Sequence, residues 1–173
     1  MKNQGKLTVT TPTDREILMT RAFDAPRRLV FDALTRPELL ERWCFGPDGW
    51  SMSKCEMDLR PGGAYRYVWR RDRDGFVMGM GGIIREIVPP ERLVTTEIFD
   101  EAWYPGEAVV TSTLVEKAGK TTLTLALLYE SKEARDIALR SGMERGMEAG
   151  YDRLEEQVLA PALRKSRERA DRS

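Results

Sequence analysis

The sequence predicts an α+β fold in which a long C-terminal helix covers one face of a curved antiparallel sheet. Segments of alternating apolar and polar residues follow one another between residues 51 and 129. The connections between these segments have hairpin length, which favours antiparallel pairing of neighbours. Apolar residues then recur at helical spacing from Ser141 to Leu159. A helix of this length is marginal alone in water, so it requires a surface to cover.

The predicted helix carries one apolar stripe, made by Met143, Met147, Tyr151, Leu154 and Val158. The acidic residues are expected on the opposite, solvent-facing side: Glu144, Glu148, Asp152, Glu155 and Glu156. Gly146 and Gly150 fall on the edge of the stripe, where each costs about 1 kcal/mol relative to alanine. We therefore expect either close packing against the sheet or room for a bound molecule at these glycines.

The segment before the sheet is expected to contain one strand and two short helices. Residues 1–14 lack periodicity and are predicted to be a disordered arm. A strand is expected from Glu16 to Phe23, and Pro26 then suits the first turn of a helix. The sequence Thr35-Arg36-Pro37-Glu38 has the form of a capping box and predicts a second helix ending near Trp43.

Six further strands are predicted, over Ser51–Leu59, Ala64–Arg71, Phe76–Val88, Arg92–Phe99, Glu107–Glu116 and Lys120–Tyr129. Alternation places Cys55 and Met57 on one face of the first of these, together with Ser51 and Ser53. Ser131 is expected to cap a helix from Lys132 to Arg140, and Ser141-Gly142-Met143-Glu144 repeats the capping-box form. The prediction is one domain over residues 15–160, followed by a charged, frayed tail over residues 161–173.

Composition excludes several classes of function. Lys and Arg total 28, as do Asp and Glu, so no overall field attracts nucleic acid or an acidic membrane. The absence of histidine excludes Ser-His-Asp and Cys-His catalysis, and we expect no metal and no cofactor. Cys44 and Cys55 lack the paired spacing of a zinc site and are predicted to be free thiols. No leader or apolar run of membrane-spanning length occurs, so we expect a soluble, cytoplasmic protein without membrane insertion.

Several short segments resemble one known family. They are Phe23-Asp24-Ala25-Pro26, Met57-Asp58-Leu59-Arg60-Pro61-Gly62-Gly63, Glu86-Ile87-Val88-Pro89-Pro90-Glu91-Arg92, Ser131-Lys132-Glu133-Ala134-Arg135-Asp136, and Ser141-Gly142-Met143-Glu144 with Asp152-Arg153-Leu154. Together they resemble the bacterial branch of the family related to the activator of the heat-shock-ninety ATPase, within the START-like (SRPBCC) superfamily. The resemblance covers about residues 16–159 and implies a helix-grip fold with a cavity between sheet and terminal helix. Where the family pattern has Trp-Trp-Gly-Pro, this chain has Trp43-Cys44-Phe45-Gly46-Pro47.

The family resemblance and the aromatic strand together suggest a ligand pocket. Its expected lining is Trp43, Trp50, Cys55, Met57, Tyr65, Tyr67, Trp69, Met143, Gly146, Met147, Gly150 and Tyr151. The alternative is that these side chains simply fill the interior. Four loop aromatics, Phe45, Trp50, Trp103 and Tyr104, are expected at the mouth of the cavity.

Few residues suggest catalysis. Glu97 could act as a general base if it faced the interior, although we expect it to face outward. Cys55 has no neighbour in sequence that would activate its thiol. Gly79-Met80-Gly81-Gly82 lacks the strand-to-helix context of a phosphate-binding loop.

We therefore expect a non-catalytic module that binds a hydrophobic or aromatic small molecule. A cyclase- or dehydrase-like enzyme using the same cavity is one alternative, and a chaperone-regulating interaction protein is another. We expect no nucleic-acid partner and no chaperone contact. The sequence is compatible with a homodimer.

Overall fold

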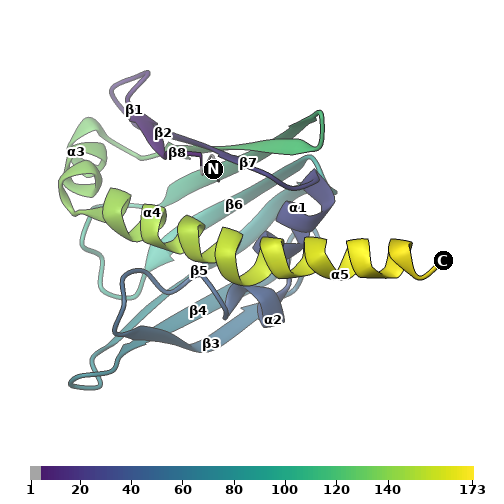
Figure 1. Cartoon of the computed structure of the whole chain (residues 1–173). Helices are drawn as coiled ribbons and strands as arrows, with labels where there is room; N and C mark the ends of the chain where they lie inside the picture. Colours follow the sequence, from purple (N-terminus) through teal and green to yellow (C-terminus); the bar gives the residue numbers. More distant parts are fainter. Residues whose placement is uncertain (1–4) are drawn as a thin grey trace.

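The computed structural model describes residues 5–173 and contains one antiparallel sheet with a long helix across it (Figure 1). The strands are β1 (Thr8–Thr10), β2 (Glu16–Phe23), β3 (Trp50–Met57), β4 (Ala64–Arg71), β5 (Val77–Val88), β6 (Arg92–Phe99), β7 (Ala108–Lys117) and β8 (Lys120–Leu128). The helices are α1 (Arg27–Thr35), α2 (Pro37–Leu40), α3 (Lys132–Arg140), α4 (Met143–Leu154), the π-helical turn η1 (Glu155–Leu159) and α5 (Ala160–Asp171). The predicted α+β class is confirmed.

The sheet order is β1-β2-β8-β7-β6-β5-β4-β3, so the first long strand lies beside the last one. β3 to β8 form the meander that hairpin-length connections predicted. β2 pairs with β8 along its whole length, from Glu16 opposite Leu128 to Phe23 opposite Thr121. This pairing leaves α1 and α2 as the crossover between the two ends of the sheet (Figure 1).

The prediction of a disordered arm over residues 1–14 is wrong for its described part. β1 pairs with β2, and the Thr8 hydroxyl donates a hydrogen bond to the Thr20 carbonyl at 3.1 Å. Leu7 is buried in the core. A strand of three residues is too short to produce a visible period, which is why the sequence pattern missed it. Residues 1–4 lie outside the described part of the chain.

The terminal helix continues to Asp171 instead of ending at Leu159, so the predicted frayed tail is helical. Pro161 has no N–H and its ring crowds the carbonyl four residues earlier, which normally ends or kinks a helix. Here the turn widens to a π-helix, and the Ala160 N–H donates to the Glu155 carbonyl five residues back. The Gln157 carbonyl, which Pro161 cannot satisfy, instead accepts a hydrogen bond from the Arg42 guanidinium. A tertiary contact therefore stabilises a helix that local rules would end.

Two of the three predicted side-chain caps are wrong. Ser131 does cap α3, accepting a hydrogen bond from the Ala134 N–H at 3.0 Å. Thr35 instead donates to the Phe31 carbonyl inside α1, and Arg36 is the N-cap residue of α2, without a side-chain cap hydrogen bond. α4 begins after Gly142, whose φ of 85° lies in the left-handed region that glycine tolerates.

A buried arginine joins the helix to the sheet. Arg21 lies on β2 between Met19 and Phe23 on the covered face and is only 1 % exposed. Its guanidinium forms ion pairs with Asp152 at 2.7 Å and with Glu155 at 3.1 Å. The expectation of a solvent-facing carboxylate is therefore wrong for Glu155, whose side chain is 14 % exposed, whereas Asp152 pairs with Arg21 and is still 46 % exposed. A buried guanidinium requires compensating charge, and α4 and η1 supply it.

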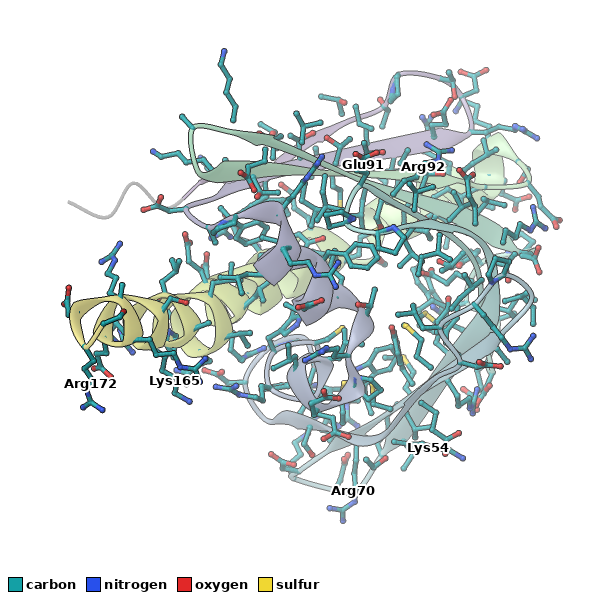
Figure 2. The ribbon with its side chains drawn as sticks, turned by 90° about the vertical axis from the view of Figure 1, so that its right-hand side faces the viewer. Lys54, Arg70, Glu91, Arg92, Lys165 and Arg172 are labelled. Atoms are coloured by element: carbon teal, nitrogen blue, oxygen red, sulfur yellow. The ribbon has the colours of Figure 1, made fainter. Side chains whose placement is uncertain are left out.

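α4 crosses the sheet, whereas α5 extends past its edge (Figure 1). None of the residues of α5 is buried, and Lys165 and Arg172 point away from the body (Figure 2). None of the helices within residues 5–173 is long and apolar enough to cross a membrane.

Candidate functional site

The inner wall of the candidate site begins on β3, where a bulge changes the predicted face. The register between β3 and β4 shifts between Met52 and Lys54. Met52 consequently shares the partly buried face with Cys55 and Met57, while Ser51 and Ser53 are exposed. The predicted grouping of Ser51 and Ser53 with Cys55 is wrong, because one extra residue inverts the alternation beyond it.

The aromatic strand β4 lines the same side of the sheet. The rings of Tyr65 and Tyr67 lie 5.1 Å apart between centroids, and those of Tyr67 and Trp69 lie 5.9 Å apart. Tyr65 donates its hydroxyl hydrogen to the Thr96 carbonyl, and the Trp69 indole donates to the Cys44 carbonyl at 2.7 Å. Tyr67 is 8 % exposed, and its hydroxyl has no hydrogen-bond partner among residues 5–173.

The helix contributes Tyr151, which lies between two aromatic rings. Its ring centroid is 5.6 Å from that of Phe23 and 5.8 Å from that of Trp43. The Trp43 indole donates to the Ala33 carbonyl at 3.0 Å, which fixes it against α1. This part of the predicted lining is core: Tyr151 is 1 % exposed and Trp43 is 5 % exposed.

The two helix glycines face the loop after α2, not the sheet. A Cβ atom on Gly150 would lie 3.5 Å from the Trp43 carbonyl oxygen, and one on Gly146 would lie 3.9 Å from Cα of Gly46. Both distances are ordinary van der Waals contacts. Packing against the sheet is therefore not the reason for either glycine.

Arg153 holds this loop to the helix, although it is not among the predicted site residues. Its guanidinium donates to the Trp43 carbonyl at 2.8 Å and to the Gly46 carbonyl at 3.0 Å. It also lies over the Phe45 ring, 3.8 Å from the centroid. The missed signal is spacing: Gly146, Gly150 and Arg153 lie four and three residues apart, and so share one helical face.

The predicted lining thus divides into two groups. Trp43, Tyr65, Tyr67, Gly150 and Tyr151 are buried. The remaining members are partly exposed: Trp50, Cys55, Met57, Trp69, Met143, Gly146 and Met147. Except for Trp50 and Gly146, these partly exposed residues pack against the core, as do Cys44 and Met52.

Glu97 faces the interior, so the expected outward orientation is wrong. Its carboxylate accepts a hydrogen bond from the Tyr104 hydroxyl at 2.9 Å. The neighbouring Ile98 is 48 % exposed on the opposite face of β6. Burial raises the pKa of the Glu97 carboxyl above its ordinary value of 4.5, and the Tyr104 hydrogen bond opposes this increase. A carboxyl group of this kind holds a proton more readily than a surface carboxylate, and its oxygens can accept hydrogen bonds.

The two cysteines are free thiols of low reactivity. Burial raises the pKa of Cys44 and of Cys55 to about 12 in each case. The thiolate is the reactive form, so neither residue is suited to nucleophilic catalysis.

The loop aromatics do not form one mouth. Trp103 and Tyr104 pack with Phe99 beside Glu97, and Phe45 lies under Arg153. Trp50 lies apart, with its ring 6.2 Å from Phe76 and under the Arg71 guanidinium. A shallow surface groove of about 590 Å³ adjoins it, lined by Asp48, Gly49, Trp50, Arg71, Asp72 and Arg73. This groove and a smaller one on α3 are open depressions outside the interface between sheet and helix.

Comparison with known proteins identifies the family. A model of the family described as "Activator of Hsp90 ATPase homolog 1-like protein" matches residues 24–158. No curated protein matches the chain. A solved structure from Rhodobacter sphaeroides is 33% identical, covering 90% of this chain and 99% of its own, with a TM-score of 0.84. One from Nitrosomonas europaea is 26% identical, covering 84% and 95%, with a TM-score of 0.74. One from Mycobacterium smegmatis is 25% identical, covering 87% and 95%, with a TM-score of 0.74.

The family match covers most of the chain, and the fold of these relatives is the one described above. The segments that resembled the family in the sequence lie almost entirely inside the matched range. This chain therefore belongs to the family of proteins like the activator of Hsp90 ATPase homolog 1, within the START-like superfamily.

Proposed function

We propose that this protein is a binding module that takes up an apolar or aromatic small molecule between the sheet and the C-terminal helix. The family fold is compatible with this role. The supporting observation is a group of partly exposed apolar side chains on the covered side of the sheet and on α4, namely Cys55, Met57, Trp69, Met143 and Met147.

The chemistry of this group favours an adaptable site. Thioether side chains are flexible and polarizable, so they adjust to guests of irregular shape. Sulfur atoms, drawn in yellow, gather on the inner side of the curved strands in Figure 2. The Tyr67 hydroxyl adds a polar group without a partner in the described part of the chain. An apolar wall with a few polar groups is typical of small-molecule sites.

Binding of the neutral dye Nile red, followed by fluorescence, tests the proposal. Cys55→Trp and Met147→Trp add bulk to the two walls at residues that take no part in the hydrogen bonds of Trp43 and Arg153. We expect each to weaken dye binding by at least about tenfold, or about 1.4 kcal/mol. Leu139→Trp is the matched control, because Leu139 is 40 % exposed on α3. Equal dye affinity in all three folded variants would contradict the proposal.

A second candidate is a cyclase- or dehydrase-like enzyme, and the inward carboxyl of Glu97 favours it. A general base must lie within reach of the proton it removes and have a pKa near the working pH. Incubation with 2-acetylnaphthalene in D₂O would then incorporate deuterium beside the carbonyl faster than buffer alone. Glu97→Gln would abolish this acceleration and leave Nile red binding intact. Absence of any acceleration by the native protein would remove the candidate.

A further inference from the structure

Glu97 is a carboxylate without a cation. Among residues 5–173 no lysine or arginine forms an ion pair with it, and only one of its two oxygens accepts a hydrogen bond, from Tyr104. The arginines of the adjoining elements are already paired. Arg85 pairs with Glu107 at 3.2 Å, and Arg66 binds Asp100 through both of its terminal nitrogens.

The surroundings of Glu97 are aromatic. Its partner Tyr104 contacts three other rings, with centroid distances of 4.7 Å to Trp103, 5.1 Å to Tyr129 and 6.0 Å to Phe99. Tyr65 donates its hydroxyl hydrogen to the carbonyl of Thr96, the residue before Glu97, and Tyr129 packs against Tyr104. Phenol and indole rings attract cations through their faces.

Glu97 is also reachable. It is partly exposed, unlike the fully buried Arg21, which has its two carboxylates already in place. Its free oxygen can therefore accept a hydrogen bond from a molecule that enters the site. A carboxylate that is largely withdrawn from water and has no cation beside it gains most from a partner that brings positive charge.

We propose that Glu97 recognises the protonated amine of an apolar or aromatic amine, with Tyr104 holding the carboxylate in place. An ammonium group supplies the missing cation, donates to the free carboxylate oxygen and lies among aromatic rings. An anionic ligand would be repelled, and a neutral alcohol would offer the hydrogen bond without the charge. This inference rests on the proposed function, because it names the class of ligand that the site takes.

A set of matched naphthalene probes tests the ligand class. They are 1-naphthylmethylamine, 1-naphthalenemethanol and 1-naphthoic acid, which share the apolar body and differ in the charge of the head group. Titration calorimetry of the full chain should show the amine binding at least about tenfold more tightly than the alcohol, as hydrogen bonds to charged groups allow. The acid should bind most weakly.

Glu97→Gln is the decisive variant, since it keeps the shape and the Tyr104 partner but removes the charge. We expect it to reduce the preference for amine over alcohol to less than about twofold, with alcohol binding retained. Glu86→Gln is the matched control on the exposed part of β5, and it should leave the preference unchanged.

The outcomes separate the two proposals. Equal binding of all three probes by the native protein would overturn the amine inference and leave the binding module standing. An amine preference that survives Glu97→Gln would also overturn it. Failure of every probe, together with failure of Nile red, would overturn the proposed function and the inference with it.

Discussion

The part of the C-terminal helix that crosses the sheet runs from Met143 to Leu159, and its two halves are covered differently. The second half is sealed against the sheet, and the first half is only partly covered. Tyr151, Leu154 and Val158 are each at most 5 % exposed, whereas Met143 and Met147 on the same stripe are partly exposed. The sealed half has the Arg21 ion pairs beneath it. The open half has Gly146 and the thioethers of Met143 and Met147. The same helical periodicity therefore supports stability in one half and an adaptable surface in the other.

The largest expected effect compares one truncation in each half. Leu154→Ala should lower the free energy of unfolding by about 2–5 kcal/mol, because it leaves a cavity in a closed core. Met147→Ala should cost about 1 kcal/mol or less, since its side chain is already partly solvated. Urea unfolding of the two variants measures the difference. Equal losses would show that the two halves are packed alike.

The next prediction concerns the contact that joins the helix to the loop after α2. Arg153→Met should lower the free energy of unfolding by about 2 kcal/mol, because two carbonyl oxygens lose a charged donor. Arg153→Lys can restore only one of these bonds and should recover part of the loss. A loss no larger than that of Arg36→Met, a change in an exposed arginine near α2, would argue against this role.

A pH dependence distinguishes Glu97 from the surface carboxylates. Its folded pKa is raised above 4.5, so between the unfolded and folded pKa values the native state holds the extra proton. Stability should therefore fall as pH rises above about 4.5, with a slope of at most about 1.4 kcal/mol per pH unit, and then level off. The phenols around Glu97 have raised pKa values and stay neutral in this window.

Glu97→Gln removes the pH dependence of stability that comes from Glu97. The difference between the unfolding free energies of the native protein and the variant therefore measures the contribution of Glu97 alone. Surface carboxylates such as Asp74, whose pKa is lowered to about 2 by Arg71, make the protein more stable as pH rises. Their contribution is the same in the native protein and in the variant, so it cancels when the two unfolding free energies are subtracted. A difference that does not change between pH 4 and pH 8 would contradict the inward, desolvated placement of Glu97.

The smallest expected effect concerns the two glycines at the boundary of the halves. Gly146→Ala and Gly150→Ala should each raise the free energy of unfolding by about 0.5–1 kcal/mol, because a Cβ atom there makes ordinary contacts and alanine favours a helix. If Gly146→Ala is more stable but binds Nile red less well, then the glycine leaves room for a guest. A loss of stability at Gly150 would instead show that Trp43 cannot tolerate the added atom.

Much of the fold could be predicted because its elements are long and strongly periodic. Three predicted strands, Glu16–Phe23, Ala64–Arg71 and Arg92–Phe99, and the helix Lys132–Arg140 coincide with the observed bounds. Of the site, the sequence indicated the aromatic strand and the apolar stripe. It did not indicate which of the predicted lining residues are buried, because the burial of a side chain depends on the elements that pack against it in the folded protein.

The sequence by itself determined where the strands lie and which helix crosses them, because alternation and helical periodicity are local properties. Only the tertiary structure decided the features that need a distant partner. The bulge after Met52 sets the face of Cys55, and the pairing of β6 with β7 places Glu97 opposite the buried Ala108. Arg21 can be buried only because Asp152 and Glu155 form ion pairs with it. The helix continues beyond Pro161 only because Arg42 donates a hydrogen bond to the Gln157 carbonyl. Charges and unsatisfied carbonyls are compensated across the fold, where residues far apart in sequence meet.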